Sequence, residues 1–148
     1  MCIKKYLMIF ILLMGWVGNA AAVKPINTTL MGGLAIKGCD PVAYFTRKAP
    51  VKGSSDYSFE WRSATWRFAS QANLDLFKAA PATYAPQYGG YCAWAVSQND
   101  TAKIDPEQWT VFDGKLYLNY NAKIQKKWLA NRDACIKDAD ANWPILIQ

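Results

Sequence analysis

Alternating aromatic and polar side chains mark a first β-hairpin in the chain. Residues 57–61 place tyrosine, phenylalanine and tryptophan at every second position, and residues 66–68 repeat this alternation after a break at residues 62–64. A period of two is typical of a strand that buries one face, because successive side chains point to opposite sides of a sheet. The two runs therefore predict a hairpin with one aromatic face in the core.

A second hairpin is predicted around Asp113-Gly114, the sequence typical of a two-residue type I′ turn. Residues 109–112 precede this turn and residues 115–118 follow it, and both runs contain residues that favour strands. A turn of this length fixes the register of the strands that it joins. The facing pairs that it predicts are Trp109 with Leu118 and Val111 with Leu116.

Outside the hairpins, the pattern predicts one more strand and a short helix. Residues 42–45 are a strand candidate that leads into a turn-rich stretch. Ser70 is expected to cap a short helix that turns Leu74 and Phe77 inward. Pro81 is expected to stop this helix, because proline cannot donate the backbone hydrogen bond that the next turn requires.

The last part of the chain predicts a longer amphipathic helix. Asn121 is a candidate N-cap, the helix is expected to reach about residue 139, and Trp143-Pro144 is expected to end the domain. Its apolar stripe consists of Ile124, Trp128, Cys135 and Ala139. Together the elements predict a small α+β domain, in which short helices and a C-terminal helix pack on an antiparallel sheet.

The first residues have the pattern of a secretory signal peptide. Lys4 and Lys5 precede an apolar run over residues 6–17, and small residues follow at Ala20-Ala21-Ala22. We expect cleavage near Ala22 and export to the periplasm or the medium. An uncleaved membrane anchor is the alternative, and it is less favoured because about 20 apolar residues are usually needed to span a bilayer.

The charge of the chain adds little information about its partners. The chain has 17 basic and 11 acidic residues, and two of the basic ones belong to the expected signal peptide. The basic residues that remain are scattered, apart from a group at Lys123, Lys126 and Lys127 that is typical of a solvated helix face. The sequence therefore gives no indication of a nucleic-acid partner.

The chain lacks several residues and motifs on which common catalytic sites depend. It contains no histidine, so the Ser-His-Asp and Cys-His pairs and imidazole metal ligands are excluded. It contains no CxxC motif, and Gly89-Gly90 is not part of a phosphate-binding loop. An enzyme that uses acid–base chemistry is accordingly the least favoured class of function.

Three cysteines follow the expected signal peptide, and three pairings among them are open on sequence grounds: the residues are Cys39, Cys92 and Cys135. Cys92 lies in the aromatic stretch QYGGYCAWAV at residues 87–96, two residues after the glycine pair. Aromatic side chains near it are candidates for a pocket lining, and these are Tyr44, Tyr88, Tyr91 and Trp94.

Cys92 has three competing interpretations. It can be a buried packing residue, since free cysteine is among the most buried residue types. It can be a ligand of a soft metal ion such as Cu(I), with partners drawn from Met31, Asp40, another cysteine or a second protomer. It can also be a reactive thiol whose pKa is lowered by a helix N-terminus, by Lys103 or by Lys115.

Several blocks of the chain, in order, resemble the exported bacterial YHS-domain proteins. The blocks are GCDPVAYF at residues 38–45, WRFAS at 66–70, Asn73-Leu74 with Phe77, YAPQYGGYCA at 84–93 and DGKLYLNY at 113–120. The likeness extends roughly over residues 34–144, which we take as one YHS-like domain. The resemblance implies an α+β fold and, in related modules of copper-transporting ATPases, a cysteine that binds metal.

What the resemblance implies about thiols carries over in part. Cys92 occupies the position of the domain's cysteine, but Tyr91 stands where many members have histidine, which weakens the inference of a metal site. Cys39 replaces a tyrosine of the family pattern, and Cys135 lies where similar proteins carry an aromatic residue. Two extra cysteines in an exported chain imply a Cys39–Cys135 disulfide, and two separate buried thiols are the alternative.

The favoured hypothesis is an exported, non-catalytic binding module that holds a soft metal ion, such as Cu(I), or a small ligand near Cys92. The alternatives are a redox protein in which Cys92 reacts, and a structural or interaction domain without a ligand. The first two hypotheses require that the sulfur of Cys92 is accessible to a ligand or a reactant.

Overall fold

The structure, a computed structural model, describes residues 22–148. The expected signal peptide falls on residues that lie outside this range, apart from Ala22. In chain order, the elements are η1 Ile36–Gly38, α1 Ala43–Thr46, β1 Ser54–Trp61, β2 Ala64–Phe68, α2 Gln71–Ala79, α3 Pro81–Tyr84, η2 Gln87–Gly90, α4 Ala93–Ser97, β3 Asp105–Phe112, β4 Lys115–Asn119, α5 Ala122–Ala130 and α6 Arg132–Leu146. Helices and antiparallel strands thus form the α+β fold that the sequence predicts.

The first hairpin forms where aromatic and polar residues alternate. Strands β1 and β2 are antiparallel, and Phe59 faces Trp66. Arg62 and Ser63 make the turn with φ angles of 51° and 58°, the left-handed geometry that a type I′ turn requires. Phe77 of α2 packs on this hairpin, with its ring centroid 4.9 Å from that of Trp66. The predicted aromatic face therefore packs on the core, with the β2 aromatics buried and those of β1 half-buried.

The second hairpin confirms the predicted register. Trp109 faces Leu118 and Val111 faces Leu116 across strands β3 and β4. Asp113, with a φ of 48°, and Gly114, with a φ of 69°, form the turn between the strands. The two hairpins do not join, since each forms a sheet of two strands, and the single sheet that we expected is replaced by two.

The strand expected at residues 42–45 is wrong, because most of this segment forms the short helix α1. Asp40 explains the difference. Its carboxylate accepts hydrogen bonds from the backbone N–H groups of Val42, at 2.8 Å, and Ala43, at 3.3 Å, as a capping residue does. The same carboxylate accepts from the N–H of Ala69 and from Asn73 Nδ2, so it ties α1 to the start of α2.

Both predicted helix caps are present. Ser70 Oγ accepts from the N–H of Asn73 at the start of α2, and Asn121 Oδ1 accepts from the N–H of Ile124 at the start of α5. The single final helix that we expected is broken at Asn131, whose backbone leaves helical geometry. Pro144 lies within α6 and does not end the domain before it.

The two halves of the expected final helix pack on different partners. Helix α5 contacts β3 and β4, as expected for a helix that lies on the sheet, whereas α6 packs mainly on α4. The contact between α6 and α4 buries Cys135 and Ala139 beside Val96. The expectation of a C-terminal helix on the sheet therefore applies to α5.

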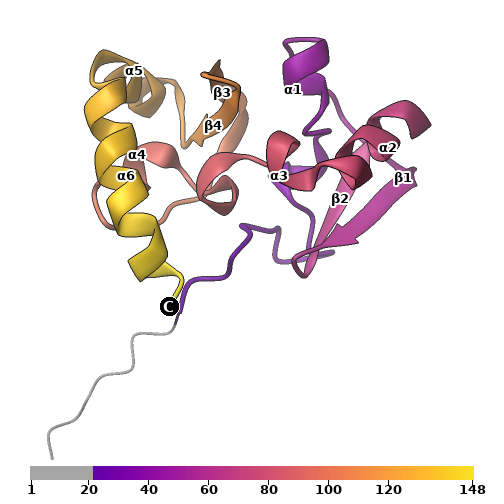
Figure 1. Ribbon diagram of the computed structural model, residues 1–148, viewed down its shortest axis with the longest axis horizontal. Coiled ribbons are helices and arrows are strands. Elements are labelled where there is room, and N and C mark those ends of the chain that lie inside the picture. The colour runs from indigo at the N-terminus through magenta and orange to yellow at the C-terminus, as the bar shows by residue number, and fades with distance from the viewer. Residues whose placement is uncertain (1–21) are drawn as a thin grey trace, which may run out of the picture.

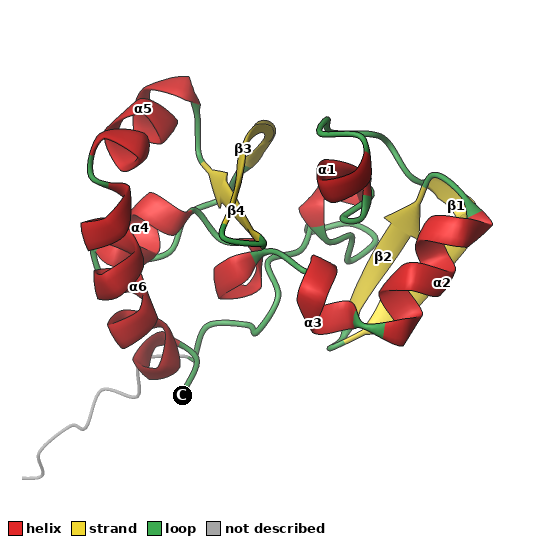
Figure 2. Ribbon diagram, turned by 45° about the horizontal axis from the view of Figure 1, so that its top comes forward, coloured by secondary structure: helices red, strands yellow, loops and turns green. Residues whose placement is uncertain are grey.

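The elements gather in two lobes (Figure 1). The first lobe contains α1, α2, α3, β1 and β2, and the second contains α4, α5, α6, β3 and β4; Figure 2 shows one hairpin in each. The larger core cluster spans both lobes, because Leu116 and Leu118 of β4 belong to it together with Trp66 and Phe77. No helix in residues 22–148 is both long enough and apolar enough to cross a bilayer.

Candidate functional site

The glycine pair allows the N-terminal segment to lie directly against η2. Gly89 has a φ of +60°, and a Cβ atom at this position would overlap the carbonyl oxygen of Pro25. The N–H of Asn27 donates to the Gly89 carbonyl at 2.8 Å, and Asn27 Nδ2 donates to the Gly90 carbonyl at 3.1 Å. The pair thus serves a close backbone approach, which positions the N-terminal segment beside η2.

Cys92 lies in the interior, at the N-cap of α4, and is 1% exposed. Its sulfur is 3.6 Å from Asn119 Oδ1. Burial raises the pKa of the Cys92 thiol, and its backbone hydrogen bonds offset this only in part. Lys103 and Lys115, the cations proposed to activate it, are both exposed, and neither contributes to this shift. A buried thiol that stays protonated is typical of a packing residue and not of a reactive cysteine.

The donors around Cys92 do not fit a soft metal ion. Cu(I) prefers thiolate and thioether ligands, whereas the neighbour of this protonated thiol is an amide oxygen. Met31 is 89% exposed on a surface turn, and the carboxylate of Asp40 already accepts four hydrogen bonds. Throughout residues 22–148, no group of three His, Cys, Asp or Glu side chains is placed to hold a metal ion.

The disulfide expected between Cys39 and Cys135 is absent from the structure. Cys39, Cys92 and Cys135 are all free and buried in the described chain. Cys39 belongs to the core cluster shared by the lobes, and Cys135 belongs to the cluster between α4 and α6. The two thiols are therefore separate packing residues, which was the alternative interpretation.

The four pocket candidates do not line a common cavity, although Tyr88, Tyr91 and Trp94 belong to one core cluster. Tyr44 is fully buried and donates to the Pro106 carbonyl at 3.0 Å. Tyr91 packs against Trp143, with ring centroids 5.9 Å apart, and Trp94 lies under the ammonium group of a lysine on α5. Of the four, only Tyr88 lines the cavity described next.

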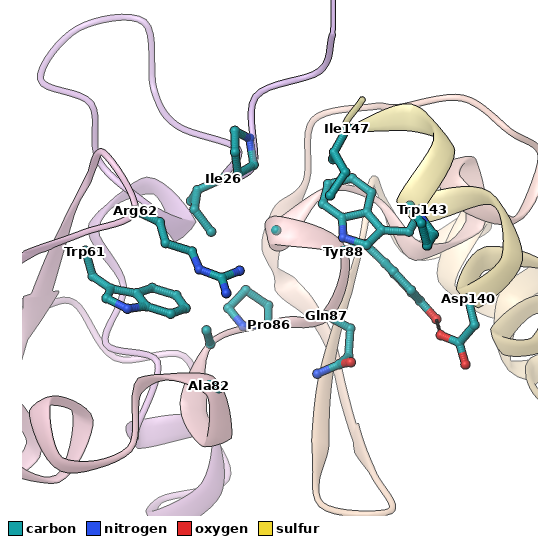
Figure 3. Close-up of a pocket in the computed structure, with 14 residues that line it drawn as sticks. Ile26, Trp61, Arg62, Ala82, Pro86, Gln87, Tyr88, Asp140, Trp143 and Ile147 are labelled. Carbon is teal, nitrogen blue, oxygen red and sulfur yellow. Dashed lines mark hydrogen bonds between the residues drawn. The ribbon is translucent and has the colours of Figure 1, made fainter.

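A cavity of about 390 Å³ lies between the lobes, and we call it the interlobe cleft (Figure 3). Trp61, at the end of β1, lines it from the first lobe, and Trp143 of α6 lines it from the second. Ile26 of the N-terminal segment, Pro86 and Tyr88 complete the wall between them. The cleft therefore has aromatic and aliphatic walls drawn from both lobes.

One cation faces this cleft without an acidic partner. Arg62, in the turn of the first hairpin, has its guanidinium carbon 4.6 Å from the centroid of the Trp61 ring. Figure 3 shows the guanidinium pointing toward the middle of the cleft. The ion pair present in residues 22–148 joins Arg132 to Asp133 and does not involve Arg62. The positive charge of Arg62 is thus available to a ligand.

The opposite wall carries a hydroxyl and a carboxylate that bind each other. Tyr88 Oη donates to Asp140 Oδ1 at 2.8 Å. Burial, followed by this hydrogen bond, raises the pKa of Tyr88, so the phenol stays neutral. Because the Asp140 carboxylate already accepts this bond, it offers less to a ligand than the unpaired Arg62 does.

Most residues of this cleft carry no signal in the sequence that would identify them as a site. Arg62 appeared as a break between strands, and Trp143 appeared as the end of the domain. Only packing of the two lobes brings the hairpin turn near the C-terminal helix. Comparison of the chain with family models, with curated proteins and with solved structures found no match.

Proposed function

We propose that this chain is an exported, non-catalytic binding module that holds a small anionic organic ligand in the interlobe cleft. The observation that carries the proposal is the guanidinium of Arg62, which faces a cavity of about 390 Å³ without an acidic partner. Small-molecule sites are typically concave, apolar cavities of about 300–1,000 Å³ with a few polar groups, often between domains. The interlobe cleft matches this size, lies between two lobes, and combines aromatic rings with polar groups in its wall.

The walls specify the chemistry of the ligand. An arginine is suited to bind a carboxylate through two parallel hydrogen bonds, and Arg62 is held over the Trp61 ring. Trp61 and Trp143 offer flat apolar surfaces to a ring or a short apolar body. The carboxylate of Asp140 on the far wall disfavours a second negative charge. We therefore expect a monoanion with an aromatic or apolar body.

The proposal keeps the binding function inferred from the sequence but places the site in the interlobe cleft and not at Cys92. Tyr88 lines the cleft, whereas Cys92 is buried and does not line it, so the site uses the start of the QYGGYC stretch and not its thiol. Membership of the YHS-domain family and export are part of the proposal, and both rest on the sequence motifs. The buried sulfur favours neither the metal site nor the redox function.

Nuclear magnetic resonance can locate the site with phenylacetate as the probe. We expect phenylacetate to shift the backbone resonances of Arg62 and Tyr88 and the indole N–H signals of Trp61 and Trp143. Phenethylamine, which carries the opposite charge on the same ring, should cause smaller shifts, because Arg62 repels it. Shifts confined to other surfaces, or equal shifts with both probes, would overturn the proposal.

A further inference from the structure

A second cavity, of about 300 Å³, lies beside the N-terminal segment, and we call it the apolar groove. Its aliphatic wall is formed by Leu34, Ile36 and Ile104, and Lys37 and Lys103 also line it. It shares no lining residue with the interlobe cleft. The groove is therefore a separate site, and what it binds does not depend on the function proposed above.

The lining of this groove is mainly apolar, and two of its polar side chains are already bound. The Thr29 hydroxyl donates to the Met31 carbonyl at 2.7 Å and accepts from the N–H of Leu34 at 3.0 Å. Asn27 Nδ2 is bound by the Gly90 carbonyl. A ligand in the groove thus meets an apolar surface and, at two positions, an ammonium group.

An unusual backbone conformation arranges two of these residues. Ile36 and Lys37 have φ angles of 47° and 51°, a left-handed geometry that is rare for a β-branched residue such as isoleucine. In this conformation Ile36 is 3% exposed while Lys37 is exposed. Non-glycine residues in this region persist only where the surrounding structure imposes them, and they concentrate at functional sites.

Two highly exposed apolar side chains adjoin the groove. Leu30, which is among its lining residues, is 105% exposed, and Met31 next to it is 89% exposed. They lie at the tip of the turn that Thr29 closes. Adjacent exposed apolar residues beside an apolar cavity are typical of a surface that contacts an apolar partner.

We propose that the apolar groove binds a single-chain anionic amphiphile, a fatty carboxylate. Its chain lies on Leu34, Ile36 and Ile104, and its carboxylate lies between the ammonium groups of Lys37 and Lys103. The lining contains no acidic residue, so the charge of the groove complements a carboxylate. Leu30 and Met31 adjoin the bound chain from the turn above it.

The test is calorimetric titration of the purified protein with laurate below its micelle concentration. We expect a complex of one laurate per chain, and at least about tenfold weaker binding by dodecyltrimethylammonium, which has the same chain with a positive head. Acetate, the head group without the chain, should not bind measurably. Equal affinity for the two amphiphiles would overturn the proposal.

Paired charge reversals locate the site. Lys37→Glu/Lys103→Glu should weaken laurate binding at least about tenfold, whereas Lys123→Glu/Lys126→Glu, on exposed positions of α5, changes the net charge equally and should leave it unchanged. All four positions are exposed, so both variants should fold, and thermal melts check this. Equal losses in the two variants would contradict the proposal.

A vesicle-binding experiment distinguishes binding of a fatty carboxylate in the groove from general binding to a membrane surface. The protein is sedimented with vesicles of phosphatidylglycerol and, separately, of phosphatidylcholine. If it binds the anionic vesicles but forms no complex with monomeric laurate, the turn at Leu30 and Met31 contacts a membrane and the groove proposal fails. Phenylacetate shifts at Arg62 are measured on the same sample, so failure of the groove and failure of the cleft are distinguishable.

Discussion

Tyr88 donates a hydrogen bond of 2.8 Å to Asp140, which lies 52 positions later in the chain. The bond joins η2 to α6 on one wall of the interlobe cleft. The Tyr88 ring also packs against Tyr117 and Trp143, with centroids 6.0 and 6.3 Å away. This side chain therefore links the second lobe internally while it shapes the cleft.

Removal of the Tyr88 hydroxyl should weaken this link without opening the core. We expect Tyr88→Phe to lower the free energy of unfolding by about 1 kcal/mol, the usual net contribution of one hydrogen bond. Asp140→Asn keeps an acceptor and should cost less. Urea denaturation followed by circular dichroism measures both, and a Tyr88→Phe protein as stable as the wild type would contradict the role of the bond.

Alanine substitutions at two glycines distinguish the stability cost of steric overlap from the stability cost of a left-handed backbone. Gly89 and Gly114 both have positive φ angles, but only at Gly89 would a Cβ meet another atom, the Pro25 carbonyl oxygen. We expect Gly114→Ala to cost about 1–2 kcal/mol for its left-handed backbone. Gly89→Ala should cost at least about 3 kcal/mol, because the N-terminal segment must also move.

Chemical denaturation of the two glycine variants measures these costs. Amide hydrogen exchange at Asn27, whose N–H donates to the Gly89 carbonyl, provides a local readout and should become faster in Gly89→Ala alone. Equal costs for the two variants would show that the N-terminal segment does not depend on the close approach.

Asp40 should be among the most sensitive positions in the chain. Its carboxylate is 0% exposed and accepts four hydrogen bonds. Asp40→Ala leaves these donors without an acceptor, so we expect a loss of at least about 3 kcal/mol, and Asp40→Asn, which keeps one oxygen, should lose less. Asp100→Ala, at an exposed position, is the matched control and should stay near the wild type. Comparable melting temperatures for Asp40→Ala and Asp100→Ala would refute this role.

The hairpins were predictable from sequence because the signals that form them are local. Alternation of side chains, the break at residues 62–64 and the turn sequence Asp113-Gly114 act within a few residues of one another. A turn or capping role for Asp40 beside Pro41 is readable from sequence, but its long-range hydrogen bonds are not, for the opposite reason. Its partners Ala69 and Asn73 lie 29 and 33 positions away, and the helix α1 that Asp40 caps replaced the expected strand.

The candidate site was less predictable than the fold. The sequence drew attention to Cys92, but a lone cysteine carries no sign of its own burial, and the structure places it inside the core. The interlobe cleft is defined by how the hairpin turn at Arg62 and the helix end at Trp143 pack across the lobes. The pattern of residues within either segment does not predict that they meet, so the cleft can be recognised only in the three-dimensional structure.

Burial of the thiols predicts a loss of stability at alkaline pH. Burial raises the pKa of Cys39, Cys92 and Cys135 in the folded protein. Above about pH 8.5, the usual thiol pKa, the unfolded chain releases these protons and the folded chain keeps them. The contribution is therefore fully present below that pH and is lost as pH rises toward the folded-state pKa values.

Urea titrations between pH 7 and pH 10 measure this loss. The free energy of unfolding should be level up to about pH 8 and decline above it. Cys92→Ala is less stable because it leaves a cavity, but its decline with pH should be shallower than that of the wild type. A stability that rises between pH 8 and pH 10 would show that the thiolates are favoured by the fold, and the redox hypothesis for Cys92 would regain support.

The most direct test of the binding function is the dissociation constant for phenylacetate in two arginine variants. Arg62→Gln removes the charge that faces the interlobe cleft, and Arg47→Gln removes an exposed charge at the end of α1, which does not line the cleft. We predict binding at least about tenfold weaker for Arg62→Gln and unchanged for Arg47→Gln. The same dissociation constant in both variants would contradict the assignment of the cleft as an anion-binding site.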